Sequence, residues 1–598
     1  MLTSGVPIRR KTIMNPAQSP SIDKFVSKCM EPQPDSTHLL QYLIAIQHQY
    51  HHIPAAAIQQ LSDRLSLGQG HIRSVIDFYS FLTLEFHGHY QLLFSDNITD
   101  RFAGNSEYYE QMQKAMRGVQ VSIGYTSCTG LCDQGPALLV NGHAIRRLDK
   151  TRIDAIAVYI RSQIPVHQWP REWFDIKDNI QRRDIQLSTD YSPGQALRTV
   201  LEQGADEFLH QLEYAGLRGR GGAGFLTARK WQYCRDAQGE QHYVVCNADE
   251  GEPGTFKDRV LLNTYTDAVI EGMTLCARVI GASRGFIYLR GEYRFLLDKI
   301  NAILESRRQQ GLLGTAILGQ SDFNFDIDIH LGAGAYICGE ESALIESLEG
   351  KRGTPRVRPP FPVQQGYMNQ PTVVNNVETF FSVNFIAAQG AGSFNRVGTE
   401  QSMGTRLLSI SGDCATPGIY EYPFGVSLRQ ILQDCGGENA QAVQMAGAAG
   451  HLVLARDFDR VMSFEDLPTG GSFMVIGSER NLLEVLDNFA RFFEHESCGF
   501  CTPCRVGTRL VAEIIAEFNR GEGSQLAFKQ LGAISDLMTH SCHCGLGCSA
   551  PTVFIDAMRD SRALFESRMQ TGDNPVFDLE RSVSEFEDMV NSVIPGVK

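Results

Sequence analysis

The sequence has no long hydrophobic run and no excess of positive charge. Nowhere in its 598 residues is there a run of about 18 consecutive apolar residues, so no segment is predicted to span a bilayer as a helix. The first 20 residues also lack the apolar core of a secretory signal, and we expect a cytoplasmic protein without direct membrane insertion. A formal net charge of −14 argues against a nucleic-acid partner, because phosphate binding requires clustered lysine and arginine.

The cysteines are not spaced as a disulfide framework. The chain has 15 of them, an odd number concentrated near the C-terminus, which suits a reducing compartment. Three of them, in SCGFCTPC, are separated from one another by two residues. The second cysteine of CHCGLG follows the last of these three after 39 residues. Three thiolates on one short loop plus one from a separate element are typical of a [4Fe–4S] cluster. The predicted ligands are Cys498, Cys501, Cys504 and Cys544.

Other chemistries remain open for these cysteines. A zinc ribbon usually brings two CxxC pairs, and a redox CxxC motif needs only two cysteines, so the observed spacing favours the cluster. We expect Cys544 as the fourth ligand, because it directly precedes a tight turn over residues 545–547 that would let backbone approach sulfur. Side chains of similar chemistry surround it, namely His540, Cys542, His543 and Cys548.

Hydrophobic period and composition divide the chain into six segments. Apolar residues recur every three or four positions over about 36–82 and in four stretches beyond 480, which predicts helices. Helix and strand patterns alternate over about 196–400, as in an α/β domain. The fold class is therefore multidomain α/β. We expect an N-terminal extension (1–35), a helical bundle plus a small α/β unit (36–165), a linker (166–195), an α/β domain (196–402), a β-grasp-like module (403–478) and a C-terminal four-helix bundle around the cysteines (479–598).

A glycine-rich loop, GLRGRGGAGF, formally satisfies GxGxxG. The Rossmann fingerprint must follow a strand, but the preceding residues have a helical pattern, so we reject that assignment. The glycines still permit close backbone approach to a phosphate, and the alternative is a tight structural turn. Three nearby cations could neutralise the phosphate: Arg218, Arg220 and Lys230.

Two further segments offer polar groups. GAGAYICGEES and NADEGEPGTFKDR supply hydrogen-bond acceptors suited to a ribityl chain, a ribose or a nicotinamide amide. The acidic residues of the second segment could equally form a solvated turn. Phe225 and Phe361 could stack on a ring system, although an isolated phenylalanine is more often a core residue.

Taken in order, the motifs resemble one family. GLRGRGGAGF, NADEGEPGTFKDR, GAGAYICGEES, PPFPVQQG, VNNVET, SCGFCTPC and CGLG resemble the flavoprotein that accepts electrons from NADH in respiratory complex I. They are also similar to the diaphorase subunits of soluble NAD-reducing [NiFe] hydrogenases and NAD-dependent formate dehydrogenases. Upstream, VIDFYSF and CTGLCDQGPALLVNG resemble the thioredoxin-like [2Fe–2S] subunit, usually a separate chain. Fusion of both resembles the hydrogenase diaphorase most.

This resemblance implies a site for FMN and NAD(H) and an SLBB-type β-grasp module. NAD(H) would stack near Phe225 and Phe361, with Glu252 near the nicotinamide and Arg358 where the family often has lysine. Glu250, Glu252 and Lys230 are the expected catalytic, that is positioning, residues. FMN would be held by Gly219, Arg220, Gly221, Gly222, Lys230, Asn247, Asp249, Glu250, Tyr288, Gly291, Glu292, Val374, Asn375 and Asn376.

The N-terminal half departs from its family. Its [2Fe–2S] relatives supply two cysteine pairs, and here the second survives as Cys128 and Cys132. Ser95 and Asp100 align with the first pair. Because such clusters strongly prefer thiolate ligands, we expect the N-terminal [2Fe–2S] cluster to be absent.

The predicted function is NADH:acceptor oxidoreduction. Hydride carries two electrons and an iron–sulfur cluster takes one at a time, so FMN stands between NAD(H) and the [4Fe–4S] cluster. No nickel-site CxxC pairs and no molybdopterin-like segment are recognisable, so the substrate-activating metal belongs to another chain. The expected partners are a ferredoxin-like iron–sulfur subunit and a hydrogenase module. The alternatives are a formate dehydrogenase module, a complex I peripheral arm, and a scaffold without catalysis.

Overall fold

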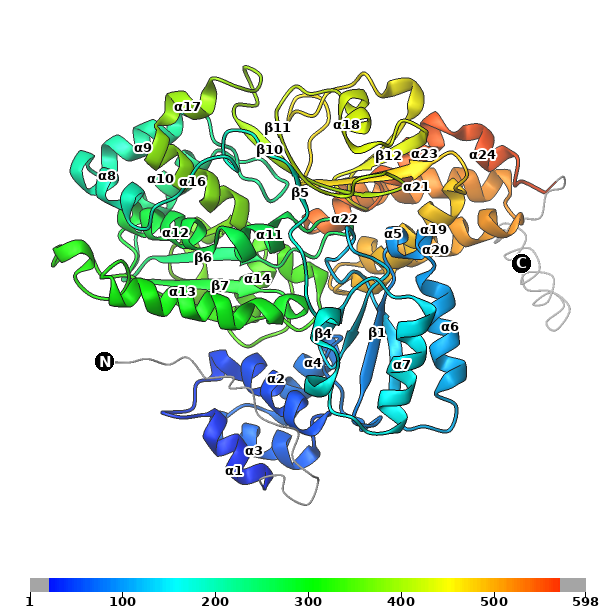
Figure 1. The fold of residues 1–598 in the computed structure, drawn as a ribbon, viewed down its shortest axis with the longest axis horizontal. Helices are drawn as coiled ribbons and strands as arrows, with labels where there is room; N and C mark the ends of the chain where they lie inside the picture. Colours follow the sequence, from blue (N-terminus) through cyan, green and yellow to red (C-terminus); the bar gives the residue numbers. More distant parts are fainter. Residues whose placement is uncertain (1–20, 571–598) are drawn as a thin grey trace, which may run out of the picture. The chain divides into compact units, whose positions relative to one another are not determined.

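The structure, a computed structural model, describes residues 21–570 (Figure 1). Its contacts divide the chain into two units, Met1–Arg480 and Asn481–Lys598, and each is described by itself. The predicted assignments of 1–20 and 571–598 lie outside the described residues. In the described part, no helix combines the length and the apolar character needed to cross a membrane.

The N-terminal segment is a bundle of four helices, as the period predicts. It begins before the predicted boundary at residue 36, because the first helix buries Val26 and Cys29 in the same core as the others. Ser21 accepts a hydrogen bond from the backbone N–H of Lys24 and caps that helix. The helices are α1 (Ile22–Cys29), α2 (Leu39–Tyr50), α3 (Ala55–Leu65) and α4 (Gln69–Phe78).

A small sheet with helices follows, which confirms the predicted α/β unit. Its strand order is β2-β1-β3-β4; β1 pairs parallel with β2 and antiparallel with β3. Apolar side chains of the sheet pack on the helices α6 and α7, which include buried Met112 and Ile156. The elements are β1 (Gln91–Ser95), α5 (Ile98–Phe102), α6 (Asn105–Ala115), β2 (Ser122–Thr126), β3 (Leu138–Val140), β4 (His143–Ile145) and α7 (Lys150–Arg161).

The central domain is a parallel sheet covered on both faces. Its order is β8-β7-β6-β9, and alternate side chains of β6, β7 and β9 enter different cores. Val244 packs with α12 and α16, whereas Val245 packs in the core that contains the N-terminal helices. Burial on both faces explains the continuous apolar run YVVC. The strands are β6 (Tyr243–Ala248), β7 (Arg284–Leu289), β8 (Asp326–Leu331) and β9 (Thr372–Asn376).

The helical pattern that precedes the first glycine loop corresponds to two helices, α8 and α9. Gly204 breaks it with φ 94°, a left-handed conformation that glycine adopts without penalty. The helices of the domain are α8 (Gln195–Gln203), α9 (Ala205–Tyr214), α10 (Thr227–Asp236), α11 (Lys257–Thr264), α12 (Thr266–Ile280), α13 (Leu297–Gln309), α14 (Glu341–Leu348), α15 (Pro362–Gln365), α16 (Val377–Gln389) and α17 (Ala391–Asn395).

A six-stranded sheet forms the β-grasp-like module, and one of its strands comes from the predicted linker. Its order is β13-β12-β14-β10-β11-β5. Glu421 on β11 anchors the linker, because its carboxylate accepts backbone N–H groups of Asp184, Gln186 and Leu187 at 2.8 Å each. The elements are β5 (Ile180–Arg182), β10 (Thr405–Gly412), β11 (Gly418–Pro423), α18 (Leu428–Cys435), β12 (Ala440–Met445), β13 (His451–Leu454) and β14 (Ser472–Gly477).

The second unit is helical, as predicted. Its expected last helix is split at Ser561, whose φ −127° and ψ 34° lie outside the helical range. Residues 545–549 form a short helix instead of the predicted tight turn. Cys544 is the N-cap of this helix. The helices are α19 (Leu482–Glu496), α20 (Thr502–Arg520), α21 (Gln525–Ser541), α22 (Gly545–Ser549), α23 (Thr552–Asp560) and α24 (Arg562–Glu566).

Candidate functional site

The predicted flavin ligands gather at the carboxyl edge of the parallel sheet. β7 and β9 flank β6 on opposite sides, so the strand order reverses beside β6. In open α/β sheets, ligands bind outside the carboxyl ends of strands at such a reversal. The structure brings together there the residues at the ends of β6, β7 and β9, namely Asn247, Asp249, Glu250, Tyr288, Gly291, Glu292, Val374, Asn375 and Asn376.

The first glycine loop lies over the end of β9. It is closed at its base by hydrogen bonds from Gly219 N to Phe225 O (2.8 Å) and from Thr227 N to Leu217 O (2.9 Å). A Cβ atom on Gly221 would lie 3.3 Å from Asn376 Cβ, a tight contact, so the loop passes close to the end of the strand. The preceding element is helix α9, which confirms that the Rossmann context is missing.

The same loop presents unused donors. Among the described residues, the backbone N–H groups of Gly221 and Gly222 have no protein acceptor. Successive free N–H groups in a glycine loop form a concave site for a phosphate or another anion. The geometry of the loop therefore fits the phosphate of a flavin nucleotide.

The structure corrects the expected charge role of two arginines. Arg218 donates to Gln401 O and packs over the ring of Phe464, in the direction of the β-grasp-like module. Arg220 is fully buried, donates to Met403 O and lies 4.8 Å from the ring centroid of Phe424. These guanidinium groups join two domains, so only the backbone of Arg220 is left to line the loop.

Of the three cations expected near the first glycine loop, Lys230 keeps its charged group at this edge. Its Nζ donates to Glu341 Oε2 at 2.7 Å and to Val374 O at 2.8 Å. The lysine belongs to α10, its carboxylate partner to α14 and the carbonyl to β9. Lys230 therefore joins three elements around the candidate site.

The second glycine loop closes over the end of β6, and an N-terminal segment supports it. Asn247 Nδ2 donates to Gly339 O at 2.8 Å. The backbone N–H of Phe81 donates to Ala333 O at 3.1 Å, and a Cβ on Gly334 would lie 2.9 Å from the Phe81 ring. The VIDFYSF motif therefore forms part of the wall of this loop.

Glu250 is a positioning residue in this geometry. Its carboxylate accepts the N–H groups of Asp258 (2.8 Å) and Arg259 (3.2 Å) at the start of α11, and the Tyr293 hydroxyl (2.8 Å). Burial, followed by the charge of Asp258, raises its pKa to about 7. All of these contacts orient the 249–252 loop.

Glu252 connects that loop to the β-grasp-like module. Its carboxylate accepts the Tyr336 hydroxyl at 2.5 Å and the N–H of Ala449 at 3.1 Å. Burial raises its pKa to about 7. The carboxyl group therefore changes charge near neutral pH.

Replacing Glu252 with glutamine should remove one ionisation near pH 7 from the pH profile of kcat/KM for NADH. Folding raises the pKa of Glu252 from 4.5 to about 7, so the folded protein favours the protonated carboxyl group. The stabilisation that this protonated group gives is complete below pH 4.5 and is lost as pH rises through 7. The melting temperature of the variant should therefore depend less on pH between 5 and 8. The exposed Glu240→Gln is the matched control. Identical profiles for Glu252→Gln and wild type would contradict this role.

Several side chains that the sequence did not single out hold the predicted ligands. Trp231 Nε1 donates to Asn375 Oδ1 at 2.9 Å. Asn376 Nδ2 donates to Asp258 Oδ2 at 2.6 Å, and Lys257 Nζ donates to Asn376 Oδ1 at 3.0 Å. Lys257 and Asp258 lie in the segment NADEGEPGTFKDR. Their position close to the acidic residues of that segment is the sequence feature that could have indicated them.

Two other predicted ligands point into the protein. Tyr288 is fully buried and its hydroxyl lies 2.8 Å from Ser347 Oγ. Glu292 accepts a hydrogen bond from Arg290 at 2.5 Å, and both side chains are buried. Both side chains therefore form hydrogen bonds inside the protein, below the carboxyl edge of the sheet.

The predicted ring-stacking residues are exposed. The side chains of Phe225 and Phe361 are 50% and 47% exposed, unlike core phenylalanines. Arg358 pairs with Glu340 at 3.3 Å, and its guanidinium lies 5.9 Å from the Phe361 ring centroid. Exposed rings of this kind are available to a planar ligand.

In the second unit, two cysteine loops meet. The rings of Phe500 and His543, one from each loop, are 5.2 Å apart between centroids. A Cβ on Gly547 would lie 2.6 Å from Cys542 Sγ and 3.2 Å from Cys504 Cβ, so only glycine permits this approach. Burial raises the pKa of Cys504 to about 11. Within residues 21–570, no group of three or more cysteine, histidine or carboxylate side chains is gathered tightly enough to hold a metal ion. The thiol chemistry of the set still fits an iron–sulfur cluster, and Cys542 lies near Cys501 and Cys504, two of the predicted ligands.

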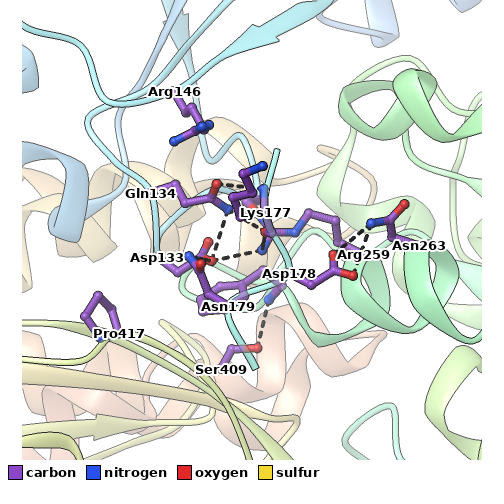
Figure 2. A network of polar contacts seen from close by, with 12 residues as sticks. Asp133, Gln134, Arg146, Lys177, Asp178, Asn179, Arg259, Asn263, Ser409 and Pro417 are labelled. Atoms are coloured by element: carbon purple, nitrogen blue, oxygen red, sulfur yellow. Dashed lines mark hydrogen bonds and ion pairs between the residues drawn. The ribbon is translucent and has the colours of Figure 1, made fainter. Parts of the chain in front are cut away.

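In the first unit, the loop that carries Cys128 and Cys132 is joined to the 249–252 loop through Arg290. Arg290 donates to Cys128 O at 2.6 Å and also to Glu250 O. Arg259 pairs with Asp133 at 3.1 Å, and both side chains are fully buried. Figure 2 shows this pair within a polar network that continues through Asn179, Lys177 and Gln134 into the linker.

Comparison with known proteins gives three family-model matches. The thioredoxin-like [2Fe–2S] ferredoxin model matches residues 23–161. The Nuo51 FMN-binding domain matches residues 212–384, and the NADH-ubiquinone oxidoreductase-F iron–sulfur binding region matches residues 484–568. These matches confirm the resemblance to the flavin and iron–sulfur family, whereas the predicted domain boundaries stay a prediction. The expected absence of the N-terminal cluster stays a prediction, since the first model covers that stretch.

Individual relatives agree with these models. NAD-reducing hydrogenase HoxS subunit alpha from Cupriavidus necator is 40% identical over 585 residues, covering 92% of this chain and 96% of the relative. A component of the NADH-quinone oxidoreductase of Escherichia coli is 41% identical over 330 residues, covering 53% and 74%. The crystal structure of an NAD+-reducing [NiFe]-hydrogenase in the H2-reduced state matches with a TM-score of 0.86 at 40% identity, covering 94% of this chain and 98% of that one.

Proposed function

This chain belongs to the family of the flavin- and iron–sulfur-containing alpha subunit of NAD-reducing hydrogenase, and from that premise we propose its function in detail. It is an NADH:acceptor oxidoreductase that passes electrons between NAD(H), FMN and one [4Fe–4S] cluster. The observation that carries the proposal is the glycine loop with free N–H donors and the exposed ring of Phe225 in the same loop. Bound FMN exchanges hydride with NAD(H) and single electrons with a cluster.

The residues at the carboxyl edge divide this work. The N–H groups of the 219–222 loop bind the flavin phosphate, and Lys230 holds α14 and β9 around it. Asn375 and Asn376 offer their backbone, while Glu250 orients the 249–252 loop. Phe225, Phe361 and Arg358 bind NAD(H), and Glu252 faces the nicotinamide. Orientation is sufficient because hydride transfer requires no side-chain nucleophile.

We assign the cluster ligands to Cys498, Cys501, Cys504 and Cys544. Iron bound there would exchange single electrons with the flavin and with a partner. The N-terminal thioredoxin-like domain holds no [2Fe–2S] cluster in this proposal, because only Cys128 and Cys132 supply sulfur. Ser95 and Asp100 hydrogen-bond to each other at 2.6 Å instead of offering a second thiol pair.

The proposed partners rest on the relatives of the chain. The relative from Cupriavidus necator is a subunit of a hydrogenase, which supports assembly with a hydrogenase module and a ferredoxin-like iron–sulfur subunit. The similarity to NADH-quinone oxidoreductase components supports a complex I arm as the second candidate. A formate dehydrogenase module is the third. The reaction would take place in the cytoplasm.

A spectroscopic experiment tests the proposal. Anaerobic NADH should bleach the flavin absorbance of the purified chain, and the purified complex should reduce NAD+ with H2. A complex that uses formate but not H2 would support the formate dehydrogenase candidate. A chain without flavin would contradict the proposal and favour a scaffold.

A further inference from the structure

The buried thiols Cys128 and Cys132 have no part in the function proposed above. Their sulfur atoms are 3.5 Å apart, and the side chains are 0% and 8% exposed. Ser95 and Asp100 fill the neighbouring positions of the pocket and are also buried. Two thiols and a hydroxyl–carboxyl pair do not fit a cluster that needs four strong ligands.

Asn97 is arranged around both sulfur atoms. Its Nδ2 donates to Cys132 Sγ at 2.9 Å and to Cys128 Sγ at 3.5 Å. Its Oδ1 accepts the N–H of Thr99 at 3.3 Å, which fixes the direction of the amide. The side chain is 1% exposed, so its donor group is held next to the two sulfur atoms.

The environment favours a thiolate at Cys128. The N–H of Gly130 donates to Cys128 Sγ at 3.4 Å, and the buried Arg290 guanidinium is nearby. The hydrogen bond from Cys132 is the main reason that the pKa of Cys128 falls to about 6. That same hydrogen bond, followed by burial, raises the pKa of Cys132. A thiolate next to a protonated thiol is the arrangement from which a disulfide forms.

We propose that Cys128 and Cys132 form a reversible dithiol–disulfide couple in place of the iron–sulfur cluster of the domain, with hydroperoxides as the oxidant class. The Cys128 thiolate attacks a peroxide oxygen, the O–O bond breaks, and a sulfenic acid and hydroxide form. The Cys132 sulfur then attacks the Cys128 sulfur. The leaving hydroxide takes the Cys132 proton and departs as water, so the two electrons reside on the reduced peroxide. A dithiol reductant returns two electrons and two protons.

Peptide mass analysis of the full chain tests this couple. The tryptic peptide between Arg117 and Arg146 contains these two cysteines and no other. After hydrogen peroxide treatment, denaturation and alkylation with N-ethylmaleimide, the doubly alkylated peptide should fall at least tenfold. An unalkylated form, about 2 Da lighter than the dithiol peptide, should replace it. Dithiothreitol should restore the alkylated form.

Variants and iron content decide between the couple and a cluster. Cys128→Ser should abolish the 2 Da loss, and Asn97→Ala should slow it about tenfold while both thiols remain. Cys246, buried on β6, is the control thiol and should stay fully alkylated. Two irons beyond the four of the [4Fe–4S] cluster, or a peptide that stays doubly alkylated after peroxide, would overturn the proposal. Flavin bleaching by NADH in the same sample tests the proposed function separately.

Discussion

Replacing Cys544 with alanine should remove the [4Fe–4S] cluster, so that iron falls from about four atoms per chain to near zero. The reason is that the cluster needs a sulfur ligand at each corner, and three ligands on one loop do not hold it firmly. The reduced sample should lose the electron paramagnetic resonance signal of the cluster. The rate of electron transfer from NADH to the partner should fall at least 100-fold. NADH oxidation by ferricyanide should continue, since that reaction needs only the flavin.

The matched control lies two residues away. Cys542→Ala removes a thiol close to Gly547 and Cys504 but should keep four irons. Loss of iron in Cys542→Ala with retention in Cys544→Ala would transfer the assignment to Cys542. The pair of variants is informative because the structure places Cys542 among the other thiols, electrostatically coupled to Cys501, Cys504 and Cys548.

Replacing Lys230 with alanine should weaken FMN binding by about tenfold or more. The lysine makes two charge-assisted hydrogen bonds that hold α14 and β9 around the proposed flavin site, and such bonds contribute about 1.5–3 kcal/mol each to folding. Their loss would loosen both elements and so weaken the binding of FMN. The loss of Lys230 also leaves the partly buried Glu341 without this cation at the site. The flavin content after gel filtration and the Kd from fluorescence titration measure the effect.

Arg229→Ala is the control for Lys230. Arg229 precedes the lysine on α10 and is exposed, so it shares the helix but not the contacts. Its variant should retain flavin. Full flavin retention in Lys230→Ala would limit Lys230 to a role in local stability, which the melting temperature would reveal.

The sequence predicted the domains and the participants of the site better than their contacts. Apolar period located helices and strands, because these depend on local patterns. The residues expected at the carboxyl edge came instead from the resemblance to the family. Sequence did not reveal that Arg220 points away from its loop, since that depends on Phe424 and Met403 about 200 residues later. The same applies to β5, an edge strand whose pairing is supplied by β11.

The positioning residues were hidden for a related reason. Trp231 acts on Asn375 through a tertiary contact and stands in no motif. Lys257 stands in NADEGEPGTFKDR, but that motif does not reveal its contact with Asn376. Glu250 was predicted as a catalytic residue, and its hydrogen bonds with the start of α11 show what holds it. The residue types indicated the chemistry of the candidate site, whereas the orientation of its side chains depends on tertiary contacts.

The N-terminal helices share a hydrophobic core with the parallel sheet, and this has a consequence for synthesis on the ribosome. Their apolar faces are completed by Val245, Tyr288 and Val374, the last of which is made roughly 300 residues after the bundle. At about 5–20 residues per second, the nascent bundle waits for roughly 15–60 s with part of its core uncovered. A chaperone that covers this face during translation would therefore raise the yield of the chain, and the upstream half would be the first part to aggregate when translation stops early.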